Sequence, residues 1–206
     1  MKILGLTGQS GAGKTLFAQM LKEKGHPSIN ADELYHSMLT PHSEILNAIQ
    51  NAFGSDFLFP DGSLDRKKLA KHVFSSKEQL SLLNSTVLPI VTNKISEIAK
   101  EYEQKGTKLL IIDAPTLFEA GYDKSCDITV SVIAPNQSRI NRIAERDGIS
   151  AEDAILRTNA QKDDSFYYTH SDYVIVNEGD INALKKKSEK LLCAIGICVQ
   201  KENYEQ

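Results

Sequence analysis

Residues 2–15 read KILGLTGQSGAGKT, and this stretch decides the fold. It opens with a short apolar run at residues 2–7, bounded by glycine, which is typical of a buried parallel strand. Residues 8–15 then fit GxxxxGK[ST] at every fixed position, and Phe17 and Leu21 continue at helical spacing. A glycine-rich loop between a strand and a helix turns its backbone N–H groups towards an anion. The stretch therefore predicts a phosphate-binding P-loop.

Two side chains at the end of this loop indicate which phosphate it binds. Lys14 can reach the β and γ phosphates of a nucleoside triphosphate, and the Thr15 hydroxyl can bind Mg²⁺. The helix that begins near Lys14 adds the positive end of its dipole. We therefore expect the chain to bind a nucleoside triphosphate together with Mg²⁺.

The rest of the chain alternates short apolar runs with segments of helical periodicity. Further strands are predicted at residues 28–30, 109–113, 128–133 and 173–176, and helices at 43–53, 80–105, 137–146, 151–159 and 181–195. Asp65 is the expected N-cap of one more helix, and the helix at 80–105 is expected to be kinked or broken before Pro89. Strands separated by helices form a parallel sheet with right-handed crossovers. The prediction is one α/β domain over residues 1–206, a three-layer P-loop NTPase-type fold with helices flanking a parallel sheet.

The composition limits the function. The 206 residues carry 24 Lys and Arg against 27 Asp and Glu, a formal net charge of −3, and 41% are hydrophobic. These values are typical of a globular protein and exclude a disordered or fibrous chain. The lack of a basic excess argues against nucleic acid as a partner, and no apolar run is long enough for a membrane span. Three cysteines without a CxxC pair, and no signal peptide, predict the cytoplasm, while the oligomeric state stays open.

Two acidic residues come at the ends of predicted strands, where the functional groups of a parallel α/β sheet collect. Asp113 ends the strand 109–113 and is a candidate for the Mg²⁺ site, in the role of a Walker-B aspartate. Asp32 follows the strand 28–30 and is a candidate general base for an acceptor hydroxyl. Asp32 could equally cap the helix that begins there, and the spacing alone leaves both interpretations open.

A basic group lies in the helix predicted at 137–146. Arg139, Arg142 and Arg146 are three and four residues apart and share one helix face. Arginines on a movable lid would neutralise charge on a transferring phosphoryl group and exclude water. The alternative is a solvated face whose arginines pair with Glu145 and Asp147.

The length and motifs narrow the class of P-loop protein. The guanine-reading NKxD pattern of a GTPase is incomplete in residues 93–96, NKIS, which also fall in a predicted helix. The chain is too short for the apparatus of a motor or transporter ATPase. A small-molecule kinase fits the length.

Motifs along nearly the whole chain resemble the dephospho-CoA kinase family. The opening ILGLTGQSGAGKT, and INAD at 29–32 followed by His36, are similar to its first two motifs. DGSLDR at 61–66 matches a signature that other P-loop kinases lack, and DAPTLFE at 113–119 resembles D-x-P-L-L-F-E. The later matches, in family order, are Arg142, Arg146, Asp147, Gln161 and residues 177–179.

The resemblance implies transfer of the γ-phosphoryl group of ATP to the ribose 3′-hydroxyl of dephospho-CoA, the last step of coenzyme A biosynthesis. It implies a helical acceptor-binding region over about residues 35–105 and a lid over about 136–172. Asp32, Lys14 and Arg142 would act in catalysis, and Thr15 and Asp113 would serve Mg²⁺. The residues around the triphosphate would be Gly11, Ala12, Gly13, Lys14, Thr15 and Leu16. The residues of the dephospho-CoA site would be Thr7, Asp32, Pro115, Leu117 and Phe118.

Some positions depart from the family pattern, namely Asn30, Leu88, Thr116 and Arg139. Because the P-loop and Asp32 are intact, we expect catalysis to be retained and the acceptor site to differ. Two alternatives stay open: a kinase for another nucleoside or nucleotide, and a catalytically silent nucleotide-binding module.

Overall fold

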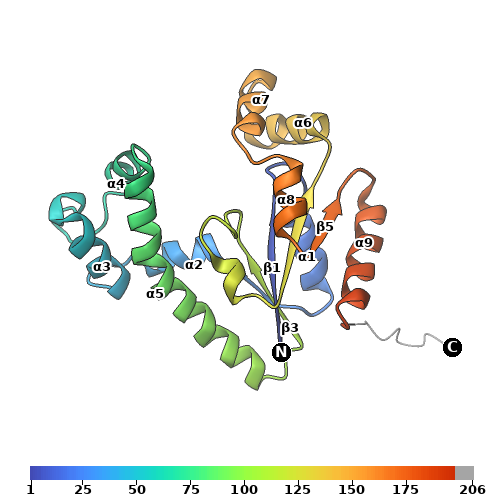
Figure 1. Ribbon diagram of the computed structural model, residues 1–206, viewed down its shortest axis with the longest axis horizontal. Helices are drawn as coiled ribbons and strands as arrows, with labels where there is room; N and C mark the ends of the chain where they lie inside the picture. Colours follow the sequence, from blue (N-terminus) through green and yellow to red (C-terminus); the bar gives the residue numbers. More distant parts are fainter. Residues whose placement is uncertain (198–206) are drawn as a thin grey trace.

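The computed structural model describes residues 1–197 and has a five-stranded sheet at its centre (Figure 1). The strand order is β2-β3-β1-β4-β5, and every neighbouring pair is parallel. The strands occupy the ranges expected from the sequence, apart from one residue added to the first, and the predicted α/β parallel-sheet fold is confirmed. The strands are β1 (Lys2–Gly8), β2 (Ser28–Asn30), β3 (Leu109–Asp113), β4 (Ile128–Ile133) and β5 (Tyr173–Val176). The helices are α1 (Lys14–Glu23), α2 (Ala31–Met38), α3 (Glu44–Phe53), α4 (Arg66–Val73), α5 (Lys77–Gln104), α6 (Asn136–Asp147), α7 (Ala151–Asn159), α8 (Asp164–His170) and α9 (Ile181–Ala194), with short 3₁₀ helices η1 (Ser55–Phe57) and η2 (Tyr122–Ser125).

Alternating side chains of β3 contribute to two separate apolar cores. Leu109 and Ile111 pack with residues of α1 and α9, whereas Leu110 and Ile112 pack with residues of α3, α4 and α5. All four side chains are fully buried. A strand buried on both faces needs helices on both faces. The sheet is therefore the middle of three layers, as Figure 1 shows.

The helices between β2 and β3 begin at side-chain caps. Ser43 accepts from the Leu46 N–H at the start of α3, and Asp65 accepts from the Lys68 N–H at the start of α4. The cap predicted at Asp65 is confirmed. Such caps satisfy backbone donors that have no partner within the helix. They fix where each helix of this region begins.

α5 is not broken before Pro89, where the sequence predicts a kink or a break. The helix runs from Lys77 to Gln104 with Pro89 inside it. Proline removes one backbone donor and disfavours helix at the preceding residue. Beyond the proline, Val91 and Ile95 are buried in the core under the sheet, and α3 and α4 also pack against α5. This tertiary packing offsets the local cost of the proline.

The helices α6 and α7 stand above the carboxyl ends of the strands, apart from the two main cores (Figure 1). Ile140 and Ile143 of α6 form a small core of their own with Ala154 of α7. The chain returns to the sheet through α8, which packs against β4 and β5. No helix within residues 1–197 is long and apolar enough to cross a membrane.

Candidate active site

The carboxyl ends of three strands bring the predicted site residues together. In the parallel register, Asp113 of β3 lies beside Leu6 of β1 on one side and beside Asn30 of β2 on the other. The P-loop follows β1, α2 follows β2, and the DAPTLFE segment follows β3. Three segments that are distant in the sequence therefore meet at the edge where functional groups of such sheets collect.

The P-loop requires glycine at three positions of positive φ, two of which lie inside the loop. Gly11 has φ 75° and Gly13 has φ 96°, a region that residues with a Cβ rarely adopt. A Cβ at Gly11 would lie 2.7 Å from the Arg139 carbonyl oxygen, and one at Gly13 would lie 2.5 Å from Nδ2 of Asn177. The same Asn177 amide donates to the Ala12 carbonyl at 2.8 Å. The loop is therefore packed closely against α6 and against the residue that follows β5.

A cavity of about 890 Å³ lies in front of this loop, and we call it the loop cavity. It is lined by all of the residues predicted around a triphosphate except Ala12, whose side chain is fully buried. Arg142 and Pro115 line the cavity as well. Cavities of this size hold nucleotide-sized ligands. The structure thus brings loop residues, a helix terminus and an arginine of α6 to one space.

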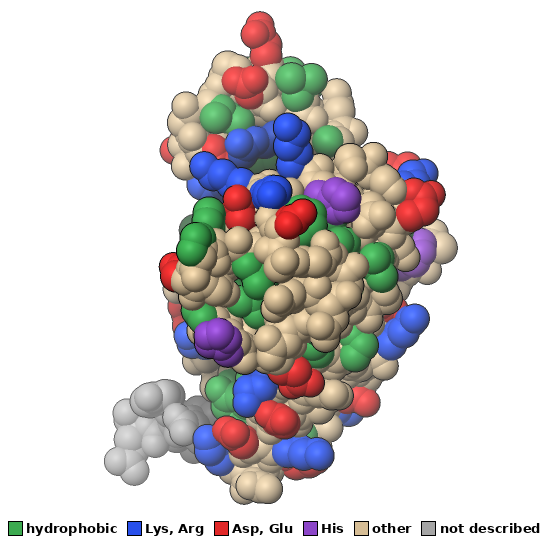
Figure 2. Space-filling view, turned by 90° about the vertical axis from the view of Figure 1, so that its left-hand side faces the viewer, with side chains coloured by type: hydrophobic (Ala, Val, Ile, Leu, Met, Phe, Trp, Pro, Cys, Tyr) green, Lys and Arg blue, Asp and Glu red, His purple; other side chains and the backbone are tan. Residues whose placement is uncertain are grey.

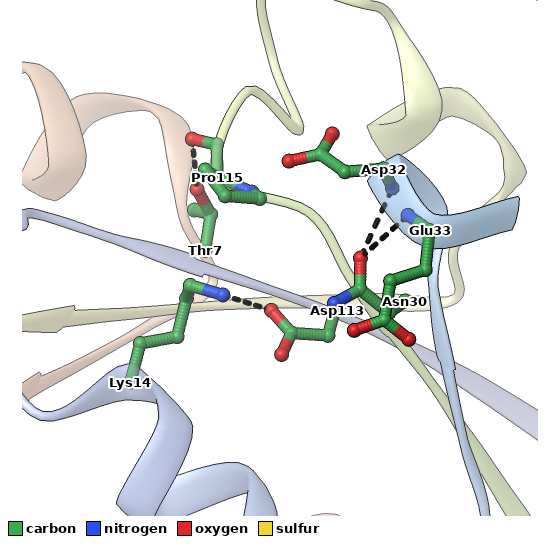
Figure 3. Close-up of polar contacts among 7 residues, drawn as sticks. All are labelled: Thr7, Lys14, Asn30, Asp32, Glu33, Asp113 and Pro115. Atoms are coloured by element: carbon green, nitrogen blue, oxygen red, sulfur yellow. Dashed lines mark hydrogen bonds and ion pairs between the residues drawn. The ribbon is translucent and has the colours of Figure 1, made fainter. Parts of the chain in front are cut away.

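Lys14 and Asp113 form an ion pair at the base of the loop cavity. Nζ of Lys14 donates to Oδ1 of Asp113, and the two side chains are only 15% and 13% exposed (Figure 3). The lysine is the first residue of α1 and the carboxylate is the last residue of β3. A cation and a carboxylate therefore lie side by side at the positive end of a helix dipole.

Asp32 is not the cap of α2. The cap is Asn30, whose Oδ1 accepts from the N–H groups of Asp32 and Glu33, each at 3.1 Å. The Asp32 carboxylate instead extends from α2 towards the segment of Pro115 (Figure 3). The capping interpretation that the sequence left open is therefore wrong, and the departure at Asn30 supplies the cap.

A second cavity of about 150 Å³ opens beside Asp32, and we call it the Asp32 cavity. Tyr35 of α2, Asn84 of α5 and Tyr122 of η2 line it together with Asp32. Thr116, from the segment after β3, lines both this cavity and the loop cavity. The two cavities are therefore neighbours that share Thr116 as a lining residue.

Two tyrosines beside Asp32 are held in their protonated form. Burial, followed by the nearby Asp32 charge, raises the pKa of Tyr122 to about 12. Burial also raises the pKa of Tyr35, and Arg66 opposes that shift. A neutral phenol can donate a hydrogen bond to an oxygen atom. The Asp32 cavity therefore combines one carboxylate with hydroxyl donors and apolar walls.

Three residues predicted for the acceptor site line neither cavity. Thr7 is 1% exposed, and its hydroxyl donates to the Pro115 carbonyl at 2.9 Å. Leu117 is fully buried in the core below the sheet, and Phe118 packs edge-on against Phe166 of α8, with 5.8 Å between ring centres. These contacts hold the segment after β3 in position, so they act on the site through its shape.

The three arginines of α6 have different environments. Arg146 is exposed and pairs with Asp147 at 2.7 Å, as the solvated-face alternative expects, but it also lines the loop cavity. Arg142 donates to the Gly11 carbonyl at 3.1 Å and lines the loop cavity. Arg139 is 5% exposed and lies against the loop, which neither alternative predicts. Figure 2 shows Lys and Arg side chains gathered at the hollow below α6 and α7.

The walls of the Asp32 cavity were missed by sequence reasoning. Tyr35, Asn84 and Tyr122 come from three elements, and no motif or spacing connects them. Thr116 departs from the family pattern, but the sequence does not indicate that it lines a cavity. The one available signal was a polar residue, Asn84, beside the apolar Leu83 in α5.

A P-loop, a carboxylate cavity and a shared boundary on a parallel α/β sheet define a P-loop kinase that phosphorylates a small molecule. The family model described as "Dephospho-CoA kinase" matches residues 2–183. The chain belongs to the dephospho-CoA kinase family, and the resemblance seen in the motifs is confirmed.

Relatives with that name match nearly the full length of both chains. A dephospho-CoA kinase of Corynebacterium glutamicum is 33% identical over 192 residues, which are 93% of this chain and 96% of the relative. One of Dehalococcoides mccartyi is 37% identical over 185 residues, which are 90% of this chain and 93% of the relative. A solved structure from Thermus thermophilus has a TM-score of 0.77 at 28% identity and covers 94% of this chain and 97% of its own.

Proposed function

We propose that this chain transfers the γ-phosphoryl group of Mg²⁺-ATP to the ribose 3′-hydroxyl of dephospho-CoA and thereby forms coenzyme A. The observation that carries the proposal is that the loop cavity and the Asp32 cavity are neighbours that share Thr116 as a lining residue. Direct transfer requires the donor phosphate and the acceptor hydroxyl to be held within reach of each other. The relatives named dephospho-CoA kinase support the identity of the acceptor.

The loop cavity would hold the triphosphate of ATP. Backbone N–H groups of the loop and the N-terminus of α1 attract phosphate oxygens. Lys14 would leave Asp113 and bind the β and γ phosphates, and Arg142 would neutralise charge on the transferring group. The proposed lid, about residues 136–172, carries Arg142 on a helix pair with its own small core, so the pair can move as a unit.

Asp32 would act as the general base. It accepts the proton of the acceptor hydroxyl while the hydroxyl oxygen bonds to the γ-phosphorus. The bond from that phosphorus to the β–γ bridging oxygen breaks, and ADP leaves with the electron pair. Lys14 and Arg142 lie where they can stabilise the charge that develops on the leaving oxygen.

The donor set at the loop fits Mg²⁺ that arrives with the nucleotide. Residues 1–197 contain no group of three or more His, Cys, Asp or Glu side chains that could hold a metal ion alone. Mg²⁺ prefers one or two protein oxygens together with phosphates and water. Thr15 would supply its hydroxyl and Asp113 its carboxylate. Bound there, Mg²⁺ would supply neutralisation of the charge on the β and γ phosphates.

The Asp32 cavity would hold the adenosine end of dephospho-CoA. At about 150 Å³ it is far smaller than the whole acceptor, and the reacting hydroxyl belongs to the adenosine ribose. Asn84, Leu83 and Leu88 of α5 line this cavity, which supports an acceptor-binding role for the helical region at about residues 35–105. The neutral Tyr35 and Tyr122 hydroxyls would orient the ribose or the carboxylate.

The enzyme would work in the cytoplasm, where thiols are kept reduced. The Cys126 thiol donates to the Tyr122 carbonyl at 3.3 Å, and burial raises its pKa to about 12. A thiol of this kind is an inert packing group. That supports the expectation drawn from the cysteine pattern.

The test is a panel of acceptors with Mg²⁺-ATP, measured as ADP release and as the mass of the phosphorylated product. We expect dephospho-CoA to have the highest kcat/KM among dephospho-CoA, AMP, CMP and adenosine. A preference for a nucleoside or a nucleoside monophosphate would replace the proposed acceptor. ATP binding without turnover on any acceptor would instead favour a silent nucleotide-binding module.

A further inference from the structure

A buried arginine lies directly behind the P-loop. Arg139 of α6 is 5% exposed. Its Nε donates to the Ser10 carbonyl at 3.1 Å, and its Nη2 donates to Oε1 of Gln161 at 2.5 Å. A buried guanidinium is costly unless its donors are satisfied. These two directional contacts, both to the loop or to a residue that touches it, therefore fix where the side chain lies.

Gln161 holds the same loop residue from its other side. Oε1 of Gln161 accepts from the Ser10 N–H at 3.0 Å as well as from Arg139. Both backbone polar groups of Ser10 are therefore fixed by side chains from outside the loop. The Arg139 carbonyl oxygen also lies 2.7 Å from the position of a Cβ at Gly11, so α6 and the loop are in close contact.

The geometry of the peptide between Ser10 and Gly11 links this contact to the phosphate site. In a planar trans peptide the C=O of Ser10 and the N–H of Gly11 point in opposite directions, and the chain has no cis peptide among its described residues. Because Arg139 draws the Ser10 carbonyl towards α6, the Gly11 N–H is turned to the other side. Gly11 lines the loop cavity. The next N–H, of Ala12, is used within the loop by the Gln9 carbonyl at 3.1 Å.

The charge of Arg139 is also available to the loop. Within residues 1–197 no carboxylate forms an ion pair with it. Burial lowers its pKa, while Tyr167 and Asp164 act in the opposite direction from nearby. Asp164 acts on Arg139 but forms no ion pair with it, so the guanidinium still adds to the positive potential at the loop, and this effect is stronger in a buried position than in water.

We propose that Arg139 is a positioning residue for the triphosphate: it holds the Ser10 carbonyl away from the loop cavity, turns the Gly11 N–H into it, and adds a positive charge behind the loop. The inference rests on the proposed function only in that the ligand is ATP. It gives α6 a second contribution to the donor site, besides that of Arg142.

The test compares ATP binding by the wild-type chain, Arg139→Gln, Arg139→Lys and Arg157→Gln, measured by calorimetry without an acceptor. Arg157 of α7 is the matched control because it also carries one positive charge, but it is exposed and pairs with Asp147 at 2.5 Å. Arg139→Gln should weaken ATP binding about tenfold or more, the usual effect of a lost charge-assisted hydrogen bond. Arg157→Gln should change it less than about twofold.

Kinetics and the lysine variant separate positioning from general damage. Arg139→Gln should raise the KM for ATP and leave the KM for dephospho-CoA unchanged. Lysine keeps the charge but cannot present the same fork of donors, so Arg139→Lys should restore ATP affinity only in part. Full restoration by lysine, or a parallel rise of both KM values, would overturn the positioning role.

Misfolding of a variant, failure of the proposed function and failure of the Arg139 role give different results. If Arg139→Gln does not fold, Arg139→Lys decides: ATP affinity equal to wild type overturns the inference, and a loss of at least about threefold at an unchanged melting temperature supports it. If the wild-type chain binds no ATP, the proposed function fails. If the wild-type chain and all Arg139 variants bind ATP equally, only the role of Arg139 fails.

Discussion

The loop cavity and the Asp32 cavity differ in the groups that shape their walls. The loop cavity is shaped by backbone: glycines of positive φ, a helix terminus, and carbonyls of Ser10 and Gly11 that Arg139 and Arg142 hold from outside. The Asp32 cavity is shaped by side chains from α2, α5, η2 and the segment after β3. We call the hydrogen-bonded wall of the loop cavity the cradle, and the packed side-chain wall of the Asp32 cavity the recess.

This difference explains how the two halves can change independently. A backbone cradle tolerates few substitutions, because each glycine and each outward hydrogen bond is needed for its shape. A recess of side chains can be altered at one residue while its outline is kept. Leu88 and Thr116 line the Asp32 cavity, and Arg139 departs at a contact outside the loop, whereas the loop motif itself is intact.

The largest expected effect comes from the Asp32 carboxylate. Asp32→Asn should reduce kcat by about 10²–10⁴, the usual contribution of a positioned base, and should leave the Kd for ATP within about twofold of wild type. The measurement pairs steady-state kinetics with ATP binding by calorimetry. These two measurements separate the cavities, because Asp32 lines the Asp32 cavity and not the loop cavity.

Glu33→Gln is the matched control for Asp32, because Glu33 is the next residue of α2 and lines neither cavity. It should keep kcat near wild type. Full activity in Asp32→Asn would refute the base role, and an equal loss in both variants would point to damage of α2.

The second-largest effect is expected from Lys14, in the wall of the loop cavity. Lys14→Ala should lower kcat/KM for ATP by about 10²–10³, because an electrostatic partner of the transferred phosphate is removed. Both the Kd for ATP and kcat should suffer, unlike in Asp32→Asn. Lys22→Ala, at an exposed position of the same helix, is the control and should behave as wild type. Unchanged ATP kinetics in Lys14→Ala would contradict the assigned role of the loop.

The sequence predicts the cradle better than the recess, and the reason is physical. The cradle residues are neighbours in the chain, so spacing and residue type together specify them. The recess is assembled by tertiary packing from residues 35, 84, 116 and 122, whose proximity no local pattern encodes. The strands were predictable because runs buried on both faces are uniformly apolar.

The same limit applies to the arginines of α6 and to α5. Helical spacing places Arg139, Arg142 and Arg146 on one face, but only the position of α6 decides that Arg139 is buried against the loop while Arg146 stays exposed at the loop cavity. α5 continues through Pro89, where the sequence predicts a kink or a break, because packing along the helix outweighs a local preference. Local rules predict elements, while contacts between elements decide roles.

A smaller effect tests whether the cradle depends on its backbone shape. Gly13→Ala should weaken ATP binding about tenfold, because φ is 96° there and the new Cβ would meet the Asn177 amide that holds Ala12. Gly25→Ala is the control, with φ 85° and no atom within 4 Å of a new Cβ. Gly25→Ala should lower the free energy of unfolding by about 1–2 kcal/mol and Gly13→Ala by more because of its clash, but only Gly13→Ala should affect ATP binding. Equal ATP affinities would show that the Asn177 contact is dispensable.

The smallest effect concerns the recess at high pH. Burial and the Asp32 charge raise the pKa of Tyr122 to about 12, so the unfolded chain releases this proton near pH 10 and the folded chain keeps it. Stability from this group is therefore complete below pH 10 and is lost between about pH 10 and 12. Wild type should lose about 1 kcal/mol more than Tyr122→Phe between pH 9 and pH 11, measured by urea unfolding. Tyr168→Phe, at an exposed tyrosine, should follow wild type.

The difference in stability loss between wild type and Tyr122→Phe should shrink in the Asp32→Asn background, because that substitution removes one cause of the raised pKa of Tyr122. If the difference is the same with and without the Asp32 carboxylate, Tyr122 does not act together with that carboxylate.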